Sequence, residues 1–134
     1  MIKSILRVLE GILRALQGPY VTEIQGVAGV VTGATYASGD AFGDIFTLTV
    51  PKRGTITHVV FLDFDDEGIQ KDVLLFSEVF TPTADNSVFA LSDTDLPKVA
   101  GVGNLIDFTD LGSNRVGQAT PALGYRAPVG KLWC

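Results

Sequence analysis

The sequence has few of the residues on which catalytic and metal sites are commonly built. Among 134 residues there is one cysteine, Cys134, and one histidine, His58. A lone terminal cysteine gives neither a disulfide framework nor a CxxC zinc site. A lone histidine excludes a pair of histidine ligands, and no glycine-rich segment matches a phosphate-binding loop. We therefore expect no enzymatic activity and no cofactor.

Long hydrophobic runs are also missing. Residues 1–18 are rich in isoleucine and leucine, but Arg7, Glu10 and Arg14 interrupt them, which excludes a signal peptide. A transmembrane span needs about 20 apolar residues, so that reading is excluded too. A helix lying on a membrane surface usually carries Trp or Phe on its apolar side, and this segment has neither. We expect no membrane partner.

The same residues predict an amphipathic helix, because apolar and polar side chains divide cleanly between the two halves of a helical wheel. Gly18 and Pro19 are typical of a helix end. A helix this short needs cover for its apolar half. Either it packs on its own domain or it associates with a partner, and a coiled-coil spacing favours association in three or more strands. The predicted contact residues follow that spacing: Ile2, Ile5, Leu9, Ile12 and Leu16.

Negative charge is concentrated in the middle of the chain. The net charge is −5, and eleven acids but only two bases lie between Asp63 and Asp110. An acidic surface repels phosphate backbones, so we expect no nucleic-acid partner.

After the helix, the pattern predicts an extended arm or linker over 19–37 and one β domain over 38–134. Strands are predicted at 45–50, 55–64, 72–80, within 96–108 and at 129–134. The segment 51–54 (PKRG) is predicted as a hairpin turn, 81–91 as carrying a helical turn, and 120–128 as a loop. Strands at such intervals without intervening helices favour a mainly β fold, an antiparallel jelly-roll-like β-sandwich.

One acidic segment partly matches a calcium loop. Asp63, Asp65 and Glu67, followed by Gly68, occupy ligand positions of such a loop. The last ligand position holds Leu74 instead of Glu, and no helix is predicted before the loop. A solvated hairpin turn explains the segment better, and these carboxylates remain weak metal candidates.

Several short motifs resemble small structural proteins of tailed bacteriophage virions, over roughly residues 36–110. These motifs are Tyr36–Asp40 with Phe42 and Gly43, Gly54–Ile56, Leu74–Phe76, Phe80–Thr83 with Asp85 and Asn86, and Phe89–Asp93. Similar proteins are expected to continue past Lys131–Cys134, where this sequence stops within a predicted strand.

The resemblance implies a β-rich protein without catalytic activity. It implies a decoration (cement) protein on the head surface of the virion, which binds the major capsid protein as a trimer. The alternative is a tail fibre, adaptor or receptor-binding module. In that case Tyr36, Tyr125 and Trp133 could line a carbohydrate site.

Overall fold

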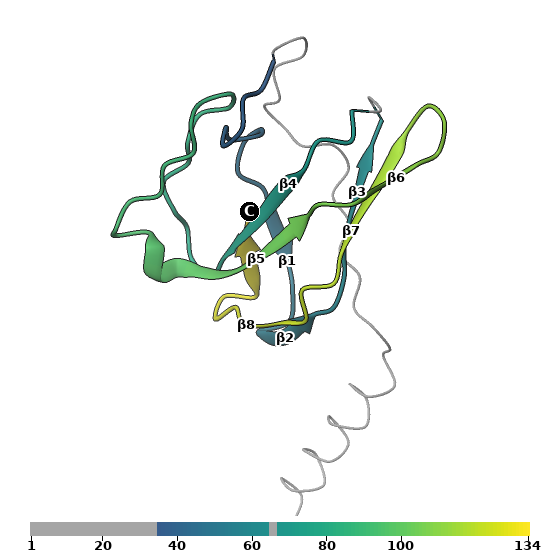
Figure 1. The fold of residues 1–134 in the computed structure, drawn as a ribbon. Helices are drawn as coiled ribbons and strands as arrows, with labels where there is room; N and C mark the ends of the chain where they lie inside the picture. Colours follow the sequence, from purple (N-terminus) through teal and green to yellow (C-terminus); the bar gives the residue numbers. More distant parts are fainter. Residues whose placement is uncertain (1–34, 65–66) are drawn as a thin grey trace, which may run out of the picture.

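The computed structural model describes residues 35–64 and 67–134, and Figure 1 shows their arrangement. The described chain is mainly β, and all of its strand pairs are antiparallel. The elements in chain order are β1 (Thr47–Thr49), β2 (Arg53–Ile56), β3 (Val59–Asp63), β4 (Lys71–Phe76), the 3₁₀ helix η1 (Leu96–Lys98), β5 (Val99–Leu105), β6 (Phe108–Asp110), β7 (Arg115–Ala119), β8 (Leu123–Arg126) and β9 (Lys131–Trp133). In this part of the chain no helix is long and apolar enough to cross a membrane. The predicted helix over 1–18 and most of the arm lie outside the described residues.

The strands form three small sheets. The first has the order β1-β9-β4-β5, the second pairs β2 with β8, and the third has the order β3-β7-β6. The predicted hairpin at 51–54 is therefore wrong, because β1 pairs with β9 and β2 pairs with β8. Both strands take partners from the C-terminal end of the chain, and a short turn sequence carries no information about such distant pairing.

The predicted strand over 55–64 is broken in the middle. β2 and β3 flank Thr57 and His58, which stand opposite the turn between β7 and β8. In that turn Pro121 has no N–H to donate, and Ala122 has a φ of 47°. The ladder therefore stops on both strands at the same place. The segment 120–128, predicted as a loop, contains β8.

The core lies along the first sheet. Its fully buried large side chains are Leu75, Phe76, Leu105 and Leu132, which come from β4, β5 and β9. The Phe76 ring also stacks on Phe80, with 3.7 Å between ring centroids. The predicted strands over 72–80, 96–108 and 129–134 thus contain the strands of the core.

No helical turn forms between 81 and 91. Asp85 and Asn86 instead make a turn, and Val88 forms a single bridge with Asp40. Asn86 has a φ of 54°, which suits a tight turn but not a helix. The one short helix among the described residues is η1, which begins after Asp95 and contains a proline in its first turn.

Candidate interaction surface

The third sheet has two unlike faces, although both are apolar. Side chains alternate across a strand, so Val60 and Leu62 of β3 point to one side and Val59 and Phe61 to the other. The register places Leu62 beside Val116 of β7. One side packs inside the molecule and the other faces solvent.

The inner side holds an aromatic cluster around a lysine. The ammonium of Lys71 lies 4.9 Å from the ring centroid of Phe61, 5.3 Å from that of Phe108 and 5.7 Å from that of Phe42. A cation over an aromatic face is attracted by the ring quadrupole. Gly117, directly opposite Phe108, leaves room for this ring, since a Cβ there would lie 2.6 Å from it. The cluster fixes β6 and β7 against the start of β4.

The outer side is exposed. Val60 is 57% exposed, Leu62 55%, Phe64 74% and Leu111 63%. Val60 and Leu62 lie on β3, Phe64 follows β3 and Leu111 follows β6. The half-buried Val116 lies on β7, between β3 and β6. We call these five residues the outer apolar face. Two polar residues share this side, Gln118 opposite Val60 and Thr109 opposite Val116. Single exposed apolar side chains are normal on protein surfaces, so the notable feature is that several gather on one side of one sheet.

The described residues on either side of 65–66 are held together beside this face. An oxygen of the buried Asp63 carboxylate accepts a hydrogen bond from the Gly68 N–H at 2.9 Å. Arg115, opposite Asp63 in the ladder, forms an ion pair with Asp110 at 3.6 Å. Gly68 has a φ of 63°, a conformation that side chains rarely adopt.

The calcium candidates are only partly described. Glu67 is exposed, and Asp65 lies outside the described residues. Among residues 35–64 and 67–134, no three His, Cys, Asp or Glu side chains gather closely enough to hold an ion.

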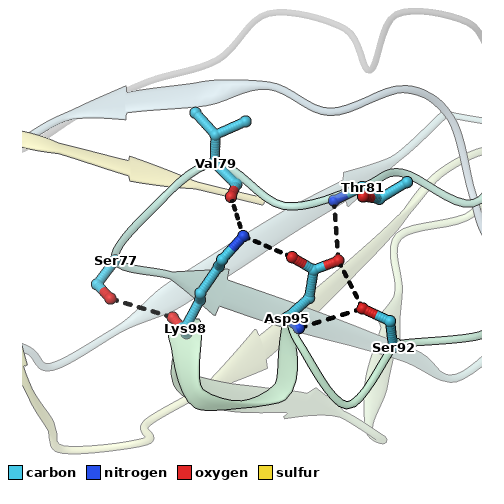
Figure 2. Close-up of polar contacts among 6 residues, drawn as sticks. All are labelled: Ser77, Val79, Thr81, Ser92, Asp95 and Lys98. Atoms are coloured by element: carbon cyan, nitrogen blue, oxygen red, sulfur yellow. Dashed lines mark hydrogen bonds and ion pairs between the residues drawn. The ribbon is translucent and has the colours of Figure 1, made fainter.

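A network of polar contacts surrounds Asp95 and Lys98 (Figure 2). The Lys98 ammonium donates to Asp95 at 2.6 Å and to the Val79 carbonyl at 2.8 Å. Asp95 also accepts hydrogen bonds from the Thr81 N–H and the Ser92 hydroxyl. The bond from Lys98, followed by that from Thr81, lowers the pKa of Asp95 from 3.8 to about 2. This network joins η1 to the chain that follows β4.

The other residues singled out in the sequence lie on different elements of the fold. His58 is exposed between β2 and β3. Tyr36 donates a hydrogen bond to Asp85, Tyr125 lies on β8 opposite Gly54, and Trp133 lies on β9 opposite Thr47. The three aromatic residues of the carbohydrate hypothesis thus come from different parts of the structure.

Burial raises the pKa of the Cys134 thiol to about 12.

The predicted partner residues Ile2, Ile5, Leu9, Ile12 and Leu16 lie outside the described residues. The outer apolar face was not singled out from the sequence. Its signal was present in 59–64, where apolar residues occupy both alternating positions apart from Asp63.

Comparisons with known proteins identify no relative. No protein-family model, no curated protein and no solved structure matches the chain.

Proposed function

We propose that this protein is a non-catalytic structural protein of a tailed bacteriophage virion, a decoration protein on the head surface. In this proposal it is a trimer that binds the major capsid protein and stabilises the shell. Its form is a jelly-roll-like sandwich preceded by an amphipathic helix over 1–18. The observation that carries the proposal is the outer apolar face, and the resemblance over 36–110 supports it.

The outer apolar face suits a protein partner. Its centre is Leu62, which stands opposite Val116, and Val116 in turn stands opposite Thr109. Val60 stands opposite Gln118, so none of these partners is charged. The centres of protein interfaces are likewise depleted of charge and ringed by polar groups.

The size of the face explains why several copies would act together. Fully burying one large apolar side chain gives about 1.5–3 kcal/mol. Four side chains that are each more than half exposed would therefore give roughly 4–8 kcal/mol on contact. Association itself costs about 4–15 kcal/mol, so a single face binds weakly. Three linked copies bind more tightly because the second and third contacts are intramolecular.

The experiment compares the full chain with Leu62→Lys and with a control, Leu96→Lys. Leu96 is also exposed, at 60%, but lies on η1 far along the chain. The probe is the purified virion of the phage that carries the gene, freed of this protein, and binding is read by co-sedimentation. We expect Leu62→Lys to reduce binding at least about tenfold, the effect of losing 1.4 kcal/mol, and the control to bind normally.

Two further measurements complete the test. The mass in solution should be three times the 14.2 kDa of one chain. Immunogold labelling should mark the head. Labelling confined to the tail would favour the adaptor or receptor-binding alternative, and absence of the protein from virions would refute a structural role.

A further inference from the structure

The third sheet has two edges, and they differ in how they are protected against pairing. β6 forms one edge; it is three residues long, ends on the exposed Asp110 and follows Asp107 directly. Short length and charge both prevent an edge from recruiting another strand. β3 forms the other edge, because its strand partner among the described residues is β7 alone. From Val59 to Leu62 it has no proline, glycine or charge, and its ladder with β7 has no bulge. We call the side of β3 that faces away from β7 the free edge.

The hairpin between β6 and β7 shows how the backbone groups of β7 are directed. The Leu111 N–H donates to the Asn114 carbonyl at 2.9 Å, so these two residues form a hydrogen-bonded pair. Bonded and non-bonded pairs alternate along an antiparallel ladder. Val116 therefore directs its N–H and C=O groups to β6, whereas Arg115 and Gly117 direct theirs to β3.

The same alternation continues on β3. Phe61 stands opposite Gly117, so its N–H and C=O groups are bonded to β7. Its neighbours Val60 and Leu62 direct theirs to the free edge. In the part of the chain that the structure describes, no hydrogen bond from a turn, loop or side chain reaches these four groups. The same two residues carry side chains of the outer apolar face, so they offer hydrogen-bonding groups and an apolar surface to a single partner.

We propose that the free edge of β3 binds an extended segment of the major capsid protein, which joins the three-stranded sheet as an antiparallel strand. This inference rests on the proposed function and specifies how the outer apolar face makes its contact. Alternate side chains of an added strand lie on one side of the sheet, so every second residue of the segment packs beside Val60 and Leu62. The segment therefore carries apolar residues at every second position, and its backbone satisfies the four groups on the free edge.

Charge distinguishes such a segment from a second copy of this chain. Each copy has a net charge of −5, so two copies repel each other. An antiparallel segment has its N-terminal end beside the C-terminal end of β3. There the exposed Glu67 lies next to Gly68, which donates a hydrogen bond to Asp63. Arg115, opposite Asp63, is already paired with Asp110. A lysine or arginine before the apolar positions of the segment would complement Glu67.

Two substitutions of one residue separate backbone pairing from side-chain contact. Val60→Pro removes an N–H on the free edge, where proline is tolerated because its nitrogen faces away from the ladder. Val60→Thr keeps this N–H and a β-branched side chain of similar size. The probe is again the purified virion freed of this protein, and binding of the full chain is read by co-sedimentation. We expect Val60→Pro to weaken binding about tenfold or more, and Val60→Thr to weaken it less than about threefold.

Amide hydrogen exchange checks the geometry on the full chain. In the free protein the amides of Val60 and Leu62 should exchange fast and that of Phe61 slowly. On the virion, exchange at Leu62 in the unmodified chain should slow about tenfold or more. The Gly117 amide, which is directed to β3, should stay protected in Val60→Pro and Val60→Thr, which shows that the ladder between β3 and β7 is intact.

Equal binding by Val60→Pro and Val60→Thr would overturn the added strand, as would fast exchange at Leu62 on the virion. Protection of Leu62 that rises with protein concentration in the absence of virions would assign the free edge to a second copy and refute the proposed segment. Failure of the unmodified chain to bind the virion, or full binding by Leu62→Lys, refutes the proposed function itself. Loss of binding in Leu62→Lys with equal binding by the two Val60 variants refutes only the strand pairing.

Discussion

Gly101→Ala tests how the first sheet is joined to the second. Gly101 lies on β5, opposite Leu75 of β4. A Cβ at this position would lie 2.5 Å from Leu123 Cδ1 and 2.7 Å from Cγ, and it would meet Cδ2 more closely still. Leu123 begins β8, so one methyl group would force the two sheets apart or push Leu123 out of its rotamer.

The expected loss of folding stability is that of overpacking a filled site. Adding a methylene-sized group to packed surroundings costs about 1–3 kcal/mol. For a chain of this length each kcal/mol lowers Tm by about 4 °C, so Tm should fall by roughly 4–12 °C. Gly124→Ala on β8 is the matched control, because a Cβ at that position would have no heavy atom within 4 Å. Its effect should be neutral or slightly stabilising, since alanine restricts the unfolded chain by about 0.4–1 kcal/mol.

Thermal and urea unfolding of the full chain measure both variants. Leu123→Ala in the Gly101→Ala background should recover part of the loss, because it removes the atoms that overlap. A double-mutant cycle would give the coupling energy between the two positions. Equal Tm values for Gly101→Ala and Gly124→Ala would refute the close approach of β5 to β8.

Three other predictions concern the core, the loop network and the aromatic cluster. Leu132→Ala, at a side chain with 0% exposure, should cost about 2–5 kcal/mol in urea unfolding, whereas Leu96→Ala, at 60% exposure, should stay within about 0.5 kcal/mol. Asp95 has a pKa lowered to about 2, so its stabilising contribution is present above pH 3.8 and is lost as the pH falls toward 2. Asp95→Asn should lower Tm at pH 7 and flatten the Tm profile between pH 4 and 2, and an unchanged profile would show that the bond to Lys98 adds no stability. Lys71→Met, which keeps the volume but removes the charge over three phenylalanine rings, should cost about 0.5–2 kcal/mol, while Lys71→Arg should cost less.

Local patterns in the sequence identified the mainly β class and most of the strands. In the predicted strand over 45–50, Phe46, Leu48 and Val50 alternate with Thr47 and Thr49, and the three apolar residues are half-buried while the two threonines are exposed. Alternation succeeds here because one face of the sheet is covered and the other is not.

Pairing partners could not be predicted in the same way. β8 is four residues long, contains Gly124 and follows Pro121, so its local pattern is typical of a loop. It becomes a strand because Arg53–Ile56 lies beside it. Its formation depends on contacts about 70 positions apart in the chain, which no local pattern records.

The outer apolar face could not be identified from the sequence either, but for a different reason. In β3 both sets of alternating positions carry large apolar residues, Phe61 on one side and Leu62 on the other. Periodicity alone therefore marks both sides as suited to burial. Only the fold distinguishes them, because Lys71 and the neighbouring rings cover Phe61 while Leu62 remains 55% exposed. A polar group at Leu62 leaves the packed side intact, whereas one at Phe61 disrupts the aromatic cluster. The two faces of one strand thus separate association from folding, and Leu62 is the position at which the proposed contact can be removed without unfolding the domain.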